Sequence, residues 1–297
     1  MKLKNIKIEN YRCFKRADID FDENITLIVG KNGAGKTAIL DAVAVAVSTF
    51  LLGIDGGVSR GILKDDARYE FYDFDGTIDS QHQFPVSIES TGDCLDKRNI
   101  KWIRSLNSEN SNTTIKDARE LTNLSKDVQG RIMTGDRSLV LPLISYYGTG
   151  RLYAQKKEKK NKKSLTEFKR QVGYVDCMAA ESNEKLMLNW FQIQTLKSLQ
   201  EQQKTGVAEK PLLLKTVEKA ICKCFERISG SKNAGIIFDL DTHRLVLEYE
   251  KADGSSRKFA MDEMSDGYKN TLSMIGDIAY RMAVLNPMLG DKVLEET

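Results

Sequence analysis

An eight-residue segment near the N-terminus has the residue types and the spacing of a phosphate-binding loop. Residues 30–37 are Gly-Lys-Asn-Gly-Ala-Gly-Lys-Thr, a complete match to the pattern G-x-x-x-x-G-K-[ST]. The glycines let consecutive backbone N–H groups face one phosphate, and the N-terminus of a following helix adds about half a positive charge. The candidate phosphate-binding residues are Gly30, Asn32, Gly33, Ala34, Gly35, Lys36 and Thr37.

Two side chains of this loop, and one basic residue upstream of it, have separate expected roles. Lys36 is the candidate catalytic residue, because the lysine of this pattern reaches the β- and γ-phosphates. The Thr37 hydroxyl is the expected protein ligand of Mg²⁺, whose other ligands are water and phosphate oxygens. Arg12 follows a predicted strand and is a further candidate for contacting phosphates, with a surface salt bridge as the alternative.

A second candidate anion site lies near the C-terminal end of the sequence. Ser265, Asp266 and Gly267 precede a run whose apolar residues recur at helical spacing to Leu285. Ser265 stands where an N-cap is expected, and its hydroxyl, the Gly267 amide and the helix N-terminus together could hold a γ-phosphate. The alternative is an ordinary helix capped by serine.

Hydropathy patterns predict an α/β protein around these sites. The apolar run 25–29 should be a buried strand that leads into the loop, and a helix should begin at Thr37 and end near Gly53. Further patterns predict two short strands within 3–21, an antiparallel sheet over 69–106, a loop over 107–116, a buried strand over 139–147, helices over 164–178, 183–203 and 212–228, a hairpin over 235–249 and a helix over 266–285. The proline at position 142 indicates that the strand over 139–147 lies at a sheet edge or starts there.

Composition limits the class of protein. The 297 residues carry a net charge of +3 and are 41% hydrophobic, which excludes disorder and gives no global electrostatic sign of nucleic-acid binding. No apolar run is long enough to span a membrane and the N-terminus lacks the features of a signal peptide, so we expect a cytoplasmic protein with no membrane contact. The Cys222-x-Cys224 pair lacks companion ligands for zinc, and the lysine-rich segment 155–163 is either a solvated loop or a phosphate contact.

The two motifs together resemble those of ABC-type ATPases. The segment from Ser265 to Tyr268 is similar to the LSGGQ-type signature of that family, and residues 3–14 resemble the N-terminus of RecF- and SMC-type heads. A short helical region in place of a coiled-coil arm, together with residues 146–151, resembles the PtuA-like ATPases of anti-phage Septu and retron systems. The resemblance implies ATP and Mg²⁺ as cofactors and ATP held between two heads, the loop of one facing Ser265 of the other.

The resemblance also defines the expected fold, domains and partners. The fold class is a P-loop NTPase of ABC type, with a mixed sheet core, an antiparallel β subdomain and a helical lobe. The expected domains are an ATP-binding core at 1–155 and a second part at 156–297 that carries the signature helix. The implied partners are further copies of the chain, as a homodimer or higher homo-oligomer, an HNH-type nuclease, and nucleic acid.

One part of the family pattern has no match in the sequence. The family places a Walker B strand, an apolar run that ends in Asp-Glu, after the signature, and we expect this part to be absent from the chain. The run 236–241 also ends in an acid, but a hairpin strand is the favoured interpretation. Without the Walker B acids, Mg²⁺ support and orientation of the attacking water are incomplete, so we expect ATP binding to exceed hydrolysis.

Three functional hypotheses follow from these observations. The first is an ATPase that dimerises on ATP and acts as a sensor or scaffold in anti-phage defence with a partner nuclease. The second is a RecF-like ATPase of DNA repair and recombination. The third is a nucleotide-binding scaffold without hydrolysis, in which ATP stabilises the dimer by mass action.

Overall fold

The computed structural model describes residues 1–148, 169–179, 184–207, 209–251 and 253–297. The chain divides into two compact units, Met1–Tyr146 and Tyr147–Thr297, which are described separately. The predicted domain boundary at residue 155, the lysine-rich segment 155–163 and the end of the segment 146–151 lie outside the described residues.

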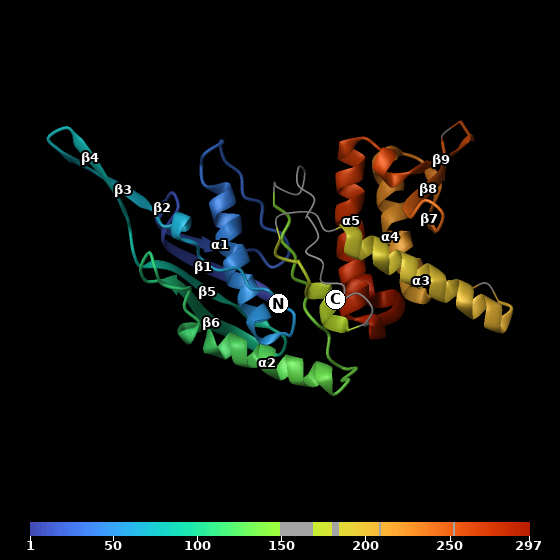
Figure 1. The fold of residues 1–297 in the computed structure, drawn as a ribbon, viewed down its shortest axis with the longest axis horizontal. Coiled ribbons are helices and arrows are strands. Elements are labelled where there is room, and N and C mark those ends of the chain that lie inside the picture. Colours follow the sequence, from blue (N-terminus) through green and yellow to red (C-terminus); the bar gives the residue numbers. More distant parts are fainter. Residues whose placement is uncertain (149–168, 180–183, 208, 252) are drawn as a thin grey trace. The chain divides into compact units, whose positions relative to one another are not determined.

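The first unit is built on an antiparallel sheet with strand order β2-β1-β5-β6 (Figure 1). Apolar residues alternate along β1, so that Ile6 and Ile8 are buried while their neighbours face outward. They form a core cluster with Val86 and Ile88. The strands are β1 (Lys2–Tyr11), β2 (Phe14–Asp20), β5 (Val86–Cys94) and β6 (Lys97–Leu106).

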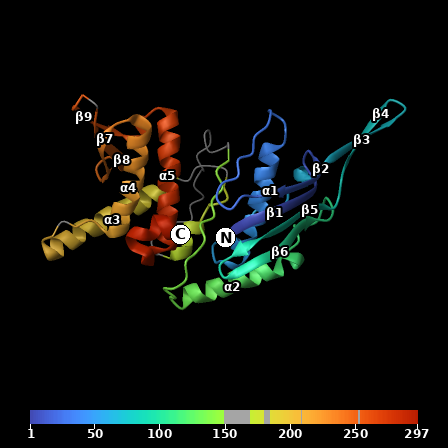
Figure 2. The ribbon, with the colours of Figure 1, turned by 180° about the vertical axis from the view of Figure 1, so that it is seen from behind.

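Two helices pack on this sheet. Helix α1 (Lys36–Ser48) contributes Ala42 and Val45 to the same core cluster and continues as a 3₁₀ segment, Thr49–Gly53. Helix α2 (Arg119–Met133) lies along β6 (Figure 2). In the described part of the chain, Lys36–Gly53 is the one helical stretch apolar enough to cross a membrane, and 56% of it is buried in the protein, as in a core helix.

A separate hairpin extends from the first unit (Figure 1). Within the described residues, strands β3 (Tyr69–Phe74) and β4 (Thr77–His82) pair only with each other, so the single sheet predicted over 69–106 is in fact two sheets. The turn residues Asp75 and Gly76 both have positive φ, 51° and 89°, which matches the right-handed twist of the two strands. The hairpin exposes large apolar side chains on the two strands: Tyr69, Phe71, Tyr72, Phe74 and Ile78.

Three predicted elements are wrong or incomplete. Residues 25–29 form no strand, and the side chains of Ile25, Leu27 and Val29 are about four-fifths exposed. A buried strand needs hydrogen-bonded neighbours, and the described residues supply none beside this run. Residues 139–147 also form no strand, although Leu139 and Leu141 are buried. Where residues of the predicted helix 164–178 are described, they form a 3₁₀ segment at 170–174.

The second unit combines helices with a small antiparallel sheet of order β7-β8-β9. Its core cluster includes Trp190, Phe191, Ile221, Leu247 and Leu272. The predicted helices at 183–203, 212–228 and 266–285 and the hairpin at 235–249 are confirmed within a few residues. The elements are α3 (Glu184–Thr205), α4 (Leu212–Ser229), β7 (Lys232–Asp239), β8 (Arg244–Glu250), β9 (Ser256–Ala260), α5 (Asp266–Leu285) and α6 (Val293–Glu296).

Candidate nucleotide-binding site

The loop at residues 30–37 turns through two glycines that adopt left-handed backbone. Gly33 has φ +83° and Gly35 has φ +87°, values that residues with a side chain rarely adopt. A Cβ on Gly35 would also lie 2.6 Å from Cζ of Phe14 and 2.7 Å from Sγ of Cys13. Both the conformation and the close approach to β2 therefore require glycine at position 35, while position 33 requires it for conformation alone.

The Lys36 side chain folds back over its own loop. Its ammonium group donates hydrogen bonds to the backbone carbonyl oxygens of Gly30, at 2.6 Å, and Lys31, at 2.7 Å. These bonds hold a positive charge at the mouth of the loop, where the predicted β- and γ-phosphates would lie. The role predicted for Lys36 toward the β- and γ-phosphates stays a prediction.

The N-terminus of α1 is open to an anion. Among the described residues no side chain caps the helix, and its first backbone bond runs from the Ile39 N–H to the Gly35 carbonyl oxygen at 3.0 Å. The earlier N–H groups carry the positive end of the helix dipole and are available to phosphate oxygens. Thr37 is exposed on this first turn, so its hydroxyl can serve as a Mg²⁺ ligand with phosphate and water completing the shell. Asn32 and Ala34 are exposed on the same loop.

Arg12 does not extend freely toward the loop but takes part in a buried charge network centred on Asp41 of α1. Its Nη1 lies 2.6 Å from Oδ2 of Asp41, and its Nε donates to Oδ1 of Asp66 at 2.8 Å. Nη1 of Arg60 forms an ion pair with Oδ1 of Asp41 at 2.9 Å, without the angle of a hydrogen bond. The Tyr146 hydroxyl donates to the same Asp41 oxygen at 2.6 Å.

The contacts of this network favour the charged form of Arg12 and the neutral form of Tyr146. Asp41 is 4% exposed, so its carboxylate depends on the two guanidinium groups and the phenol in place of water. Burial disfavours the charged guanidinium of Arg12, but the hydrogen bond to Asp66 and the nearby carboxylates outweigh it and raise its pKa. Burial and the bond to Asp41 raise the pKa of Tyr146. Of the two alternatives for Arg12, the salt bridge is present, and it anchors the start of α1.

Sequence reasoning missed Asp41, Asp66 and Arg60. The available signal was an acid placed among the core positions of an apolar helix, since Asp41 lies one turn from Ala38 and Val45. A buried acid at such a position requires a cationic partner. The identity of the partners depends on distant chain segments and was not readable from spacing.

The residues of the predicted anion site in the second unit lie at the start of α5, where a helix was expected, and their role in binding an anion stays a prediction. Ser265 is the N-cap residue with extended backbone, φ −60° and ψ 150°, and no described side chain forms a capping bond there. Ser265, Asp266 and Gly267 are exposed. A Cβ on Gly267 would meet nothing within 4 Å, so the protein leaves open space on that side of the helix terminus.

The other acidic and cysteine patterns have structural roles. Asp239 ends β7 and accepts hydrogen bonds from the backbone N–H groups of Asp241 and Thr242, as a hairpin turn requires. The run 236–241 is therefore a hairpin strand and its turn. Cys222 and Cys224 lie on α4, and burial raises the pKa of Cys222 to about 11. No group of three or more metal-ligating side chains gathers within the described ranges of the chain.

Comparison with family models decides the family. A model described as an AAA domain matches residues 5–229, which include the loop, α1 and nearly all of the four-stranded sheet. The chain belongs to the AAA domain family. AAA-domain proteins are ATPases as a family, so the predicted P-loop ATPase class is confirmed at that level.

Curated relatives match this AAA domain over short segments. A protein named DNA double-strand break repair Rad50 ATPase from Methanosarcina mazei is 50% identical over 42 residues, 14% of this chain and 4% of that protein. A protein named DNA replication and repair protein RecF from Actinobacillus pleuropneumoniae is 35% identical over 104 residues, 33% of this chain and 27% of that protein. The chain thus matches only a small part of either relative, and the matches support the predicted grouping with SMC- and RecF-like ATPases.

Two solved structures resemble this chain distantly. The SMC head domain from Thermotoga maritima has 13% sequence identity and a TM-score of 0.42, with 97% of this chain and 74% of that chain covered. The recombination mediator protein RecF bound to ATP has the same identity and TM-score, with 97% and 83% covered.

Proposed function

We propose that this AAA-domain chain is an ATP-binding ATPase of the SMC and RecF type that acts on DNA and pairs with a second copy when ATP is bound. The observation that carries the proposal is the loop at 30–37, with Lys36 held at its mouth and an uncapped helix behind it. The named relatives, a Rad50 ATPase and a RecF protein of DNA repair, support DNA as the object of its action.

The second unit supplies the other half of the proposed ATP site. Ser265 and Gly267 are exposed at the N-terminus of α5, where open N–H groups favour a phosphate. In the proposed pair, the loop of one copy binds the triphosphate and Ser265 of the other copy contacts its γ-phosphate. ATP is then an interfacial ligand and stabilises the pair by mass action.

Binding is proposed to exceed turnover. Lys36 would neutralise charge that develops on the phosphates, and Thr37 would hold a Mg²⁺ ion that would add to this neutralisation. Asp41, the acid closest in sequence to the loop, lies on α1 and is committed to Arg12, Arg60 and Tyr146, so it is not proposed as a water-orienting base. A slow ATPase, or a scaffold that binds ATP without hydrolysis, is the expected behaviour of residues 1–297.

The direct test is ATP affinity measured by titration calorimetry. Lys36→Ala should weaken ATP binding at least tenfold, because it removes the charge at the loop mouth. Lys31→Ala is the matched control, since Lys31 is an exposed lysine of the same loop that contributes only its backbone carbonyl to the Lys36 contact. Equal affinity of the Lys36 variant and the unaltered chain would refute the phosphate-binding role.

A defence role with a nuclease partner is a second candidate. The supporting observation is that the described helices of the second unit are short, 22 residues in α3 and 18 in α4, with no long arm of the coiled-coil type. We propose on this basis an anti-phage sensor or scaffold that works in the cytoplasm with an HNH-type nuclease. Co-expression with the nuclease encoded by a neighbouring gene tests it: a complex that forms only with the intact Lys36 loop supports the role, and absence of a complex contradicts it.

A further inference from the structure

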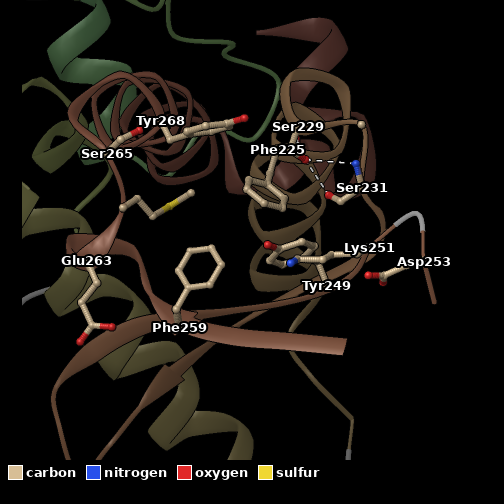
Figure 3. Close-up of a pocket in the computed structure, with 12 residues that line it drawn as sticks. Phe225, Ser229, Ser231, Tyr249, Lys251, Asp253, Phe259, Glu263, Ser265 and Tyr268 are labelled. Carbon is tan, nitrogen blue, oxygen red and sulfur yellow. Dashed lines mark hydrogen bonds between the residues drawn. The ribbon is translucent and has the colours of Figure 1, made fainter. Parts of the chain in front are cut away.

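A pocket of about 670 Å³ opens beside Ser265 in the second unit (Figure 3). The end of α4, strands β8 and β9 and the start of α5 line it, so its walls come from four separate elements. Its volume lies within the range of small-molecule sites, which are mostly apolar with a few polar groups. No motif predicted this pocket, and the proposed ATP site uses only Ser265 from its rim.

Aromatic rings form the apolar wall. Phe225 contacts Tyr249 at a centroid distance of 5.0 Å and Tyr268 at 6.0 Å, and Tyr249 contacts Phe259 at 5.7 Å. The Tyr249 pairs are edge-to-face, with interplanar angles of 67° and 81°. In an edge-to-face pair, the ring that presents its edge keeps faces that its partner does not cover, and Tyr249, Phe259 and Tyr268 are only partly buried. A further flat ring can therefore stack against this wall.

Three charged side chains line the rim: Lys251, Asp253 and Glu263. Glu263 is paired with Arg244, with Oε1 of Glu263 3.2 Å from Nη1 of Arg244. Asp253 accepts hydrogen bonds from the backbone N–H and the hydroxyl of Ser255, at 2.9 and 2.6 Å. Both carboxylates on the rim are thus already engaged within the protein.

Lys251 is the remaining charge. It lies close enough to Asp253 to contribute to the lowered pKa of that carboxyl, yet its ammonium group forms no ion pair within 4 Å among the described residues. The uncapped N-terminus of α5 at Ser265 adds a second positive pole to the same pocket. The pocket therefore combines partly exposed aromatic rings with an unpaired lysine and a helix N-terminus at its rim.

We propose that this pocket binds one nucleotide unit, with its base stacked on the aromatic wall and its phosphate held by Lys251 and the N-terminus of α5. A planar base with a single phosphate is the ligand that satisfies both properties at once, and stacking on aromatic rings tolerates any base. The unit comes from a free nucleotide or from a single strand of nucleic acid. This site uses no residue of the loop at 30–37, and it shares Ser265 and the N-terminus of α5 with the proposed ATP site.

The test measures binding of a fluorescent ten-nucleotide thymidine strand to the 297-residue chain by anisotropy. The background is Lys36→Ala, which removes nucleotide binding at the loop and separates this proposal from the proposed function. Tyr249→Leu should weaken binding about tenfold through lost stacking. Lys251→Met should lower the slope of log affinity against log salt by about 0.7, the contribution of one phosphate contact in a single strand. Tyr72→Leu and Lys232→Met are matched controls outside the pocket and should change neither.

Two further probes identify the source of the nucleotide. If thymidine monophosphate displaces the labelled strand, the site accepts free nucleotides as well as strands. If the strand binds and the monophosphate does not displace it, the site is specific for single-stranded nucleic acid. Both outcomes support the proposal. Equal binding of an abasic ten-unit strand would overturn it, because the base would not be recognised. Unchanged binding by the Tyr249→Leu and Lys251→Met variants, with an unaltered melting curve from Trp190 fluorescence as proof of folding, would also overturn it.

Discussion

Replacing Asp41 by asparagine should destabilise the first unit more than any exposed charge substitution. The carboxylate is 4% exposed and has Arg12, Arg60 and Tyr146 within 2.9 Å. Breaking a fully buried ion pair costs about 3–5 kcal/mol, and an exposed one costs about 0–1 kcal/mol. The Arg12 and Arg60 side chains remain 32% and 29% exposed, so water can solvate part of the released charge. We therefore expect a loss of about 2–3 kcal/mol.

Each unit contains a buried tryptophan, which allows this loss to be assigned. Trp102 lies in the first unit and donates from Nε1 to the Ala46 carbonyl oxygen at 3.0 Å, and Trp190 lies in the second unit. In a Trp190→Phe background, Trp102 emission should show an unfolding midpoint about 5–10 °C lower for Asp41→Asn. The control Asp18→Asn removes a weak surface contact to Lys7, at 3.9 Å, and should cost under about 0.5 kcal/mol. A loss below about 1 kcal/mol for Asp41→Asn would refute the network as a structural anchor.

Three further outcomes are expected. Gly35→Ala should lower the free energy of unfolding by about 2–4 kcal/mol, because an alanine there is strained in left-handed backbone and overlaps β2. Gly33→Ala has the strain alone and should lower it by about 1 kcal/mol. Equal losses of the two variants in urea unfolding would contradict the packing argument. Burial raises the pKa of Cys177 to about 11, so at pH 8 iodoacetamide should modify the exposed Cys13 first and Cys177 only on unfolding. Mass spectrometry of the modified protein should find this order, and the reverse order would contradict it. Hydrogen bonds from a lysine and a backbone N–H lower the pKa of Asp93 to about 2, so its contribution to stability is present above pH 4 and is lost as pH falls to 2. In Asp93→Asn, the free energy of unfolding should therefore fall less steeply with pH in this range. An unchanged slope would contradict the shift.

The sequence predicted best those features that are encoded locally. Helix α5 spans Asp266–Leu285, with Ser265 in the N-cap position as predicted. The prediction succeeded because the N-cap residue type, the helical periodicity and the end at Leu285 all lie within one segment. The loop at 30–37 follows its motif for the same reason, with left-handed glycines where the backbone must turn.

Features that depend on distant partners were missed. The run at 25–29 has strand composition, but a strand exists only when a neighbour pairs with it, and composition does not supply the neighbour. Strand β9 contains few apolar residues and forms through pairing with β8. Helix α2 was overlooked although Leu121, Leu124, Val128 and Ile132 are spaced as on one helical face. The Asp41 network and the aromatic pocket each join segments far apart in sequence.

The central claim, that two copies share each ATP site, is tested most directly by mixing two defective variants. Lys36→Ala removes the loop charge and Ser265→Arg blocks the start of α5, so neither variant alone should form an ATP-dependent pair. A mixed pair contains one intact site, with the loop of the Ser265→Arg copy facing Ser265 of the Lys36→Ala copy. Sedimentation velocity with a non-hydrolysable ATP analogue should therefore show pairs in the mixture and monomers in each variant alone. Monomers throughout, with pairs formed by the unaltered chain, would contradict the shared site.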